Sequence, residues 1–474
     1  MEPVWDLRRF ADSVSVIDYA GGSLTYAGLE RAGQTVAKAV GSRSLVFCLC
    51  RNEIGSVVGY VGMMQGSVVP LLLSADIDGI LLEKLVRIYR PSHLWVPADT
   101  MAGFDGMTVV HEAYGYMLMC TGLEGYSLHD DLALLLTTSG STGSPKLVRQ
   151  SYANVRSNAE SIAGYLELDA RERPITTLPM NYTYGLSIIN SHLLVGATLL
   201  LTERGIMERD FWDFLGGAGA TSFGGVPYTY QMLDRLRFCR RDQPSLRYVT
   251  QAGGKLPLEL HKRFARWAAD SGKRFVVMYG QCEATARMGW LPPAYALEKR
   301  GSMGIAIPGG RFRLVADDGT EITEPWVTGE LVYEGPNVTL GYAERGEDLA
   351  LGDERSGTLM TGDMAQIDED GFFYIVGRRK RFLKVYGNRV NLDEVDRMVT
   401  DELGIECAST GTDDHLCIFV TDSAMADVAR ALVARRTRLN PQAFGVAVVP
   451  EIPKNGAGKV LFEALARLNA GVTR

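Results

Sequence analysis

Hydrophobic residues in the first 300 positions follow two different spacings. A spacing of three to four residues, typical of an amphipathic helix, occurs over 29–40, 82–89 and 256–267. Short apolar runs without alternation, typical of strands buried on both faces, occur at 44–49, 132–137, 198–201 and 275–279. Because the two kinds of segment alternate along the chain, the pattern predicts an α/β protein with parallel-rich sheets and covering helices.

The pattern changes twice in the C-terminal part of the chain. After about residue 305 it becomes strand-rich, with segments at 312–315, 329–333 and 372–376. From residue 378 a strand (416–420), a helix (424–436) and a strand (444–449) predict a compact α/β unit. We therefore expect a large N-terminal domain over residues 1–377, with a β-rich subdomain at about 305–377, and a small C-terminal domain over residues 378–474.

Composition and charge exclude several classes of protein. The chain has 474 residues, 46% hydrophobic and 22% charged, which allows two or three domains with substantial cores. Its net charge of −7 argues against nucleic acid as a partner. No apolar stretch approaches the roughly 20 residues of a membrane helix, and the first residues lack a signal-peptide pattern. With seven scattered cysteines, these features predict a cytoplasmic enzyme without a membrane partner.

A hydroxyl-rich loop, Thr138-Ser-Gly-Ser-Thr-Gly-Ser-Pro-Lys146, follows the apolar run at 132–137. Its glycines let backbone N–H groups converge on an anion, and its hydroxyls and lysine add donors and charge. The candidate phosphate ligands are Thr138, Ser139, Gly140, Ser141, Thr142, Gly143 and Lys146. The loop differs from that of P-loop NTPases, because two residues separate its second glycine from the lysine. A solvated linker is the alternative interpretation.

Five further segments follow this loop in order. They are 178–185 (Leu-Pro-Met-Asn-Tyr-Thr-Tyr-Gly), 279–283 (Tyr-Gly-Gln-Cys-Glu), 361–363 (Thr-Gly-Asp), 377–384 (Gly-Arg-Arg-Lys-Arg-Phe-Leu-Lys) and 456–459 (Gly-Ala-Gly-Lys). Together with the loop they resemble the motifs of the adenylate-forming superfamily, which includes acyl-CoA synthetases, adenylation domains of peptide synthetases and luciferases. In character the chain is most similar to the AMP-dependent acyl-CoA synthetases.

The resemblance implies activation of a carboxylic acid by ATP, giving an acyl-adenylate and pyrophosphate. It implies that the loop holds the β- and γ-phosphates, that Glu283 and Thr142 organise Mg²⁺, and that Lys459 bridges the carboxylate and the α-phosphate. Such cations and a metal ion offset the repulsion between a carboxylate and the nucleotide. Lys454, five residues earlier, is the competing choice for the catalytic lysine.

The resemblance also assigns the nucleoside site. Asp363 matches the carboxylate that binds the ribose hydroxyls, Arg378 the cation beside it, and Tyr279 the ring that stacks on adenine. Further nucleotide-binding positions are Gly254, Lys255, Gly280, Gln281 and Cys282. A turn aspartate and a core tyrosine are the ordinary alternatives for Asp363 and Tyr279. The family usually has threonine where this chain has Cys282, so a weaker contact, or a non-catalytic nucleotide-binding paralogue, is a further alternative.

The acid-binding residues implied by the resemblance are Tyr182, Tyr184, Gly185, Val226 and Gly253. Peptide-synthetase domains usually carry an aspartate in the segment corresponding to 181–187, and its absence disfavours an amino acid. Hydroxybenzoate-activating relatives commonly have an asparagine near the position of Thr183, which also weakens that interpretation. We expect a fatty or other apolar acid; a stand-alone enzyme that loads an aryl or amino acid onto a carrier protein is the alternative.

For the second reaction the family rotates a mobile C-terminal domain about a hinge, which here corresponds to Lys380. Lys384 and Gly387 would then lie beside the channel through which a thiol enters. The resemblance implies that the acceptor is the pantetheine thiol of CoA or of a carrier protein, and the sequence leaves these two open.

Overall fold

A mixed eight-stranded sheet forms the centre of the N-terminal part of the computed structural model, which describes residues 3–100, 106–137, 146–385, 388–412, 414–437, 439–454 and 460–472. Its strand order is β19-β9-β8-β4-β3-β5-β7-β6, parallel in the middle and antiparallel at both edges. The strands are β3 (Leu45–Cys50), β4 (Val69–Ser74), β5 (His93–Pro97), β6 (Thr108–Ala113), β7 (Tyr116–Cys120), β8 (Leu132–Thr137), β9 (Leu147–Ser151) and β19 (Gly341–Ala343).

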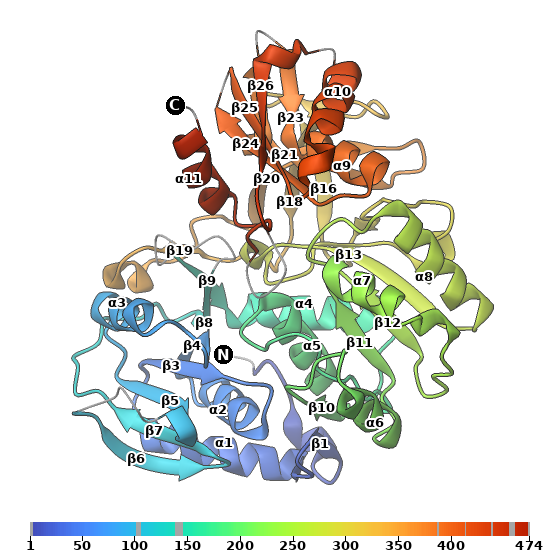
Figure 1. Ribbon diagram of the computed structural model, residues 1–474. Helices are drawn as coiled ribbons and strands as arrows, with labels where there is room; N and C mark the ends of the chain where they lie inside the picture. Colours follow the sequence, from blue (N-terminus) through green and yellow to red (C-terminus); the bar gives the residue numbers. More distant parts are fainter. Residues whose placement is uncertain are drawn as a thin grey trace.

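Helices cover both faces of this sheet, as the unalternating apolar strands predict (Figure 1). Val46 and Cys48 of β3 pack in one core with α1 (Tyr26–Val40) and α2 (Ile54–Gln65). Phe47 and Leu49 point to the opposite core, which α3 (Gly79–Tyr89) closes. The predicted helix at 82–89 ends where Pro91 requires it, because residue 90 adopts a left-handed conformation.

A second, five-stranded sheet carries the segments that follow. Its strands β11 (Ser222–Gly225), β12 (Tyr248–Gln251) and β13 (Arg274–Tyr279) are parallel, and β14 (Gly289–Trp290) and β15 (Ile305–Ala306) continue it antiparallel. A small sheet joins β10 (Leu199–Leu201), β1 (Val14–Asp18) and β2 (Ser23–Thr25). The accompanying helices are α4 (Tyr152–Tyr165), α5 (Thr183–Leu194), α6 (Arg209–Gly217), α7 (Pro227–Arg235) and α8 (Leu258–Asp270).

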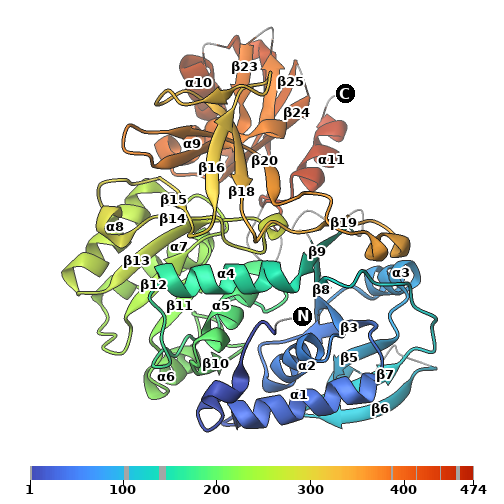
Figure 2. The ribbon, with the colours of Figure 1, turned by 180° about the vertical axis from the view of Figure 1, so that it is seen from behind.

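The strand-rich region forms an antiparallel sheet in the order β17-β16-β18-β20-β21. Its strands are β16 (Arg311–Val315), β17 (Glu321–Ile322), β18 (Gly329–Glu334), β20 (Thr358–Ile367) and β21 (Phe373–Arg378). The last unit contains β22 (Phe382–Val385), β23 (Asn388–Asn391), β24 (Cys407–Thr412), β25 (His415–Val420) and β26 (Phe444–Val448) with α9 (Leu392–Leu403), α10 (Ala426–Thr437) and α11 (Phe462–Val472). Figures 1 and 2 show this unit at one end of the molecule, beside β16, β18 and β20.

The predicted α/β class is therefore observed, with a parallel centre and antiparallel edges in the largest sheet. In the described part of the chain, no helix combines the length and hydrophobicity needed to cross a bilayer. The domain boundary at residue 378 stays a prediction.

Candidate active site

Four predicted nucleotide-binding residues meet at the carboxylate of Asp363. The Tyr279 hydroxyl donates a hydrogen bond to Asp363 Oδ2 at 2.5 Å, and Gln281 Nε2 donates to the same oxygen at 2.9 Å. Arg378 Nε lies 3.4 Å from Oδ1, because Asp363 and Arg378 are paired across β20 and β21. Asp363 is 5% exposed, and burial raises its pKa while the Arg378 charge opposes that rise.

A sharp turn after β13 sets the direction of Gln281 and Glu283. A Cβ atom on Gly280 would lie 1.6 Å from the carbonyl oxygen of Ala286, so a side chain cannot be accommodated there. The turn continues into a short 3₁₀ helix that contains Cys282 and Glu283. One tight turn therefore presents two of the predicted side chains from the end of a buried strand.

Glu283 lies in a cluster with Tyr342 of β19. The Tyr342 hydroxyl donates to Glu283 Oε1 at 2.7 Å, and burial together with the Glu283 charge raises the pKa of Tyr342. Lys146 Nζ lies 3.4 Å from the centre of the Tyr342 ring, and the Arg355 guanidinium carbon lies 4.5 Å from it. Arg355 also donates to the carbonyl oxygen of Glu283 at 3.0 Å. The arrangement sets two cations and one carboxylate around a single ring.

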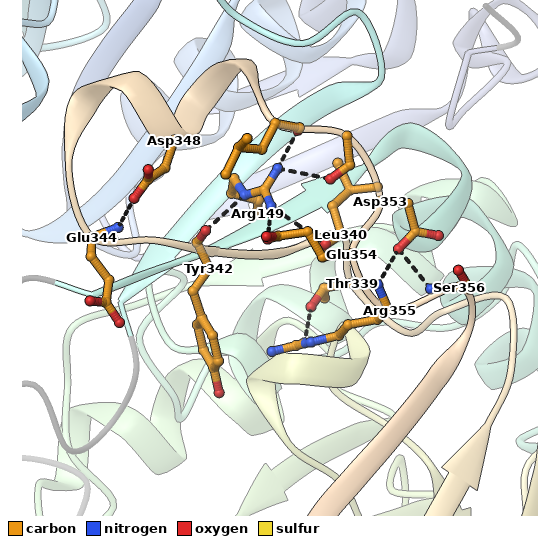
Figure 3. Close-up of polar contacts among 12 residues, drawn as sticks. Arg149, Thr339, Leu340, Tyr342, Glu344, Asp348, Asp353, Glu354, Arg355 and Ser356 are labelled. Atoms are coloured by element: carbon orange, nitrogen blue, oxygen red, sulfur yellow. Dashed lines mark hydrogen bonds and ion pairs between the residues drawn. The ribbon is translucent and has the colours of Figure 1, made fainter.

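Arg149 of β9 fixes the segment that carries Tyr342. Its side chain is fully buried and forms an ion pair with Glu354. It donates to the carbonyl oxygens of Tyr342 at 2.9 Å and Gly352 at 3.1 Å. Figure 3 shows the Tyr342 ring extending away from Arg149, so the backbone is anchored while the ring reaches toward Arg355.

The predicted acid-binding residues also lie together. The ring centres of Tyr182 and Tyr184 are 6.3 Å apart in an edge-to-face arrangement. A Cβ atom on Gly253 would lie 2.8 Å from the Tyr182 hydroxyl and 3.0 Å from Val226 Cγ1. Tyr184 is buried, which raises its pKa to about 12, and its hydroxyl lies 2.7 Å from Thr250 Oγ1. A Cβ atom on Gly185 would lie 2.3 Å from the Pro179 carbonyl oxygen, so glycine is needed for this contact.

Gly254 and Lys255 follow Gly253 in the sequence, and Lys255 reaches β21 of the β-rich sheet. The Gly254 carbonyl accepts a hydrogen bond from Gln251 Nε2 at 2.8 Å. Lys255 Nζ donates to the Ile375 carbonyl at 3.1 Å. Burial of the amine, reinforced by the Arg397 charge, lowers the pKa of Lys255 to about 8.

Several predicted residues lie outside the described residues: Thr138, Ser139, Gly140, Ser141, Thr142, Gly143, Gly387 and Lys459. Lys380 and Lys384 have described backbones, in a short 3₁₀ helix (Arg379–Arg381) and in β22, but their side chains are not described. Lys454, the competing lysine, forms an ion pair with Glu406.

The donor set around Glu283 is compatible with magnesium. No group of three or more histidine, cysteine, aspartate or glutamate side chains suited to a metal occurs within the described ranges. Magnesium bound to a nucleotide needs only one or two carboxylates, because phosphate and water oxygens complete its coordination. Glu283 supplies such a carboxylate, with Oε1 already oriented by Tyr342.

Three residues join the site that the sequence did not single out: Tyr342, Arg355 and Arg287. Tyr342 and Arg355 reach Glu283 from 59 and 72 positions away, and no local pattern marks such contacts. Arg287 is buried against Tyr184, with its guanidinium carbon 4.7 Å from the ring centre. The sequence did hold a signal for it, since Arg287 is the one charged residue in the run 284–290.

Comparisons with known proteins identify enzymes that are similar to this chain. The model of the AMP-binding enzyme family matches residues 122–343. The chain is 28% identical to a feruloyl-CoA synthase of an Amycolatopsis species over 96% of both chains. The chain is therefore similar to the AMP-binding enzyme family. It is also 28% identical to a 2-succinylbenzoate–CoA ligase of Bacillus velezensis, over 73% of this chain and 71% of the relative.

A solved structure supports the fold over nearly the whole length. The O-succinylbenzoate coenzyme A synthetase of Bacillus subtilis in complex with AMP aligns with a TM-score of 0.79 at 22% identity, covering 98% of each chain. The recognition of the adenylate-forming superfamily, the fold class and the expectation of an AMP-forming acid–thiol ligase are therefore confirmed.

Proposed function

We propose that the protein couples an aromatic carboxylic acid to coenzyme A through an acyl-adenylate made from ATP. The observation that carries the proposal is the convergence of Tyr279, Gln281 and Arg378 on the buried carboxylate of Asp363. A buried carboxylate with cationic and hydroxyl neighbours is suited to accept hydrogen bonds from a ribose.

Two observations favour an aromatic acid over the fatty acid that the sequence alone favoured. The relatives described above are named for 2-succinylbenzoate and ferulate, which are both aromatic acids. Tyr182 and Tyr184 form an edge-to-face pair at the predicted acid-binding positions, a geometry that a further aryl ring can extend. The apolar Val226 in the same cluster keeps a fatty acid as the competing substrate class.

In the first reaction an oxygen of the substrate carboxylate attacks the α-phosphorus, and the bond from that phosphorus to pyrophosphate breaks. We assign Lys459 to the carboxylate and α-phosphate, and the 138–146 loop to the β- and γ-phosphates. A magnesium ion held by Glu283 and Thr142 would neutralise phosphate charge. Lys146 and Arg355, which flank the Tyr342 ring, add positive charge beside Glu283.

In the second reaction the thiol sulfur attacks the acyl carbon, loses its proton, and AMP leaves with the former carboxylate oxygen. We assign residues 378–474 to a lid that turns about Lys380 between the two reactions. Arg378 supports this division, because its Nε faces Asp363 while its backbone N–H donates to Asp393 of α9 at 3.0 Å. Lys384 and Gly387 would then line the thiol channel.

An acid panel tests the proposal. Hydroxylamine traps the adenylate as a hydroxamate, so benzoate, cinnamate and ferulate can be compared with octanoate and palmitate in one assay. We expect hydroxamate from the aromatic acids and a thioester when CoA replaces hydroxylamine. Trapping with fatty acids alone would refute the aromatic assignment, and transfer only to a carrier protein would refute CoA as the acceptor.

Two variants separate the reactions. Lys459→Ala should abolish adenylate formation but still convert supplied acyl-adenylate to thioester. Lys380→Pro should form the adenylate but transfer it poorly, because proline fixes φ at the pivot. Equal loss of both reactions in either variant would contradict its assigned role.

A further inference from the structure

Three arginine side chains are deeply buried in the described part of the chain, and they differ in their partners. Arg149 forms an ion pair with Glu354. Arg381 forms ion pairs with Asp393 and Asp396, both at 2.5 Å. Arg287 is 2% exposed, yet none of its contacts with described residues is to a carboxylate. A buried cation without an anion is costly unless something else compensates its charge.

The partners of Arg287 among the described residues are all neutral. Its Nε donates to Ser187 Oγ at 3.1 Å, and one terminal nitrogen donates to the Tyr165 hydroxyl at 3.2 Å and contacts the Met278 sulfur. The guanidinium also lies over the Tyr184 ring, where the π-electrons attract a cation. The other terminal nitrogen donates to no described residue. These contacts orient the guanidinium but leave a net positive charge and an open donor.

The charge lies within the acid-binding cluster. Tyr184, which stacks under the guanidinium, contacts Tyr182 edge-on, and Tyr182 reaches Gly253. Burial raises the pKa values of both tyrosines, and the Arg287 charge acts on both in the opposite direction. A substrate held among these side chains would therefore experience an unneutralised positive charge at short range in a poorly screened environment.

We propose that Arg287 is a specificity-determining residue that selects acids carrying a second carboxylate, remote from the reacting carboxyl group. The inference rests on the proposed ligase function, and it narrows the substrate class from aromatic acids to aromatic dicarboxylic acids. The second carboxylate supplies the anion that the fold omits around Arg287, and it accepts the hydrogen bond that the open terminal nitrogen can donate. The aryl ring of such an acid lies against the tyrosine pair.

Matched acids measure this selection. The pairs are cinnamate with 4-carboxycinnamate, and 4-oxo-4-phenylbutanoate with 2-succinylbenzoate, which differ only by the second carboxylate. In acid-dependent exchange of labelled pyrophosphate into ATP, the wild type should prefer at least one dicarboxylate over its partner by about 10²-fold in kcat/KM, which is the order expected for a buried charged hydrogen bond. Arg287→Met should remove that preference, because KM should rise far more for the dicarboxylates than for the matched monocarboxylates.

Arg287→Lys and thermal unfolding separate selection from a structural role. Arg287→Lys keeps the charge and should retain most of the preference. Arg287→Met should not lower Tm, because it removes an unpaired buried charge, whereas Arg149→Met leaves the carbonyl oxygens of Tyr342 and Gly352 without their donor and should lower Tm. An equal loss of kcat/KM for both members of each pair, or a wild type that prefers the monocarboxylates, would overturn the inference and leave the ligase function standing. If no acid supported pyrophosphate exchange, the ligase function itself would be overturned.

Discussion

Removal of the Tyr342 hydroxyl tests whether Glu283 is a positioned metal ligand. In Tyr342→Phe the ring remains under Lys146 and beside Arg355, so only the 2.7 Å hydrogen bond to Glu283 Oε1 is lost. A hydrogen bond to a charged group contributes about 1.5–3 kcal/mol, which corresponds to a factor of roughly 10–150. If Glu283 must be held in one orientation to bind Mg²⁺, that free energy is lost from the metal-bound state.

The assay is the Mg²⁺ dependence of acid-dependent pyrophosphate exchange. We expect the half-saturating Mg²⁺ concentration to rise by about tenfold or more in Tyr342→Phe. Tyr26→Phe is the matched control, because it removes a buried hydroxyl that donates to the Ala197 carbonyl at 2.6 Å outside the site. The control should lower Tm and leave the Mg²⁺ dependence unchanged. An unchanged Mg²⁺ dependence in Tyr342→Phe would refute the reasoning.

Three further predictions follow from particular residues. Asp363→Asn should weaken ATP binding by about 10–100-fold in calorimetry, since it removes the charge on which three side chains converge, and unaltered affinity would contradict the ribose assignment. Burial lowers the pKa of His192 to about 4, so its contribution to stability is complete above its unfolded pKa of about 6.5 and is lost as pH falls toward 4. In urea titrations over that pH range, the unfolding free energy of the wild type should fall by on the order of 3 kcal/mol more than that of His192→Gln. Equal losses in the two proteins would show that His192 does not cause the pH dependence. Gly280→Ala should lower the unfolding free energy by about 1–3 kcal/mol or more and impair exchange, because the added Cβ overlaps the Ala286 carbonyl. Gly164→Ala is the control and should not destabilise the protein, because no atom lies within 4 Å of the added Cβ.

The sequence predicted those strands whose burial appears as a continuous apolar run along the chain. The unalternating run at 132–137 coincides with β8 (Leu132–Thr137), and the run at 275–279 with most of β13 (Arg274–Tyr279), because both are covered on two sides. The pairing of β9 beside β8 could not be predicted. Its Arg149 looks like a surface residue, but carbonyl groups and Glu354 from some 200 positions away satisfy it in the core.

Sequence motifs likewise predicted only part of the candidate site. Tyr279, Gln281, Asp363 and Arg378 follow recognisable motifs, and strand pairing brings them together. The partners that orient Glu283 come from β19 and the segment after it, so only the folded chain reveals them. Arg287 has no carboxylate partner in the part of the chain that the structure describes, and the sequence could not reveal this because it depends on which side chains surround the guanidinium.

Acid-dependent exchange of labelled pyrophosphate into ATP by the wild-type protein tests the central claim most directly. Reversible adenylate formation predicts that label enters ATP only when a carboxylic acid and Mg²⁺ are both present, and that added CoA diverts the adenylate to thioester and AMP. Tight ATP binding without exchange for any acid, or hydrolysis to ADP and phosphate, would contradict the account.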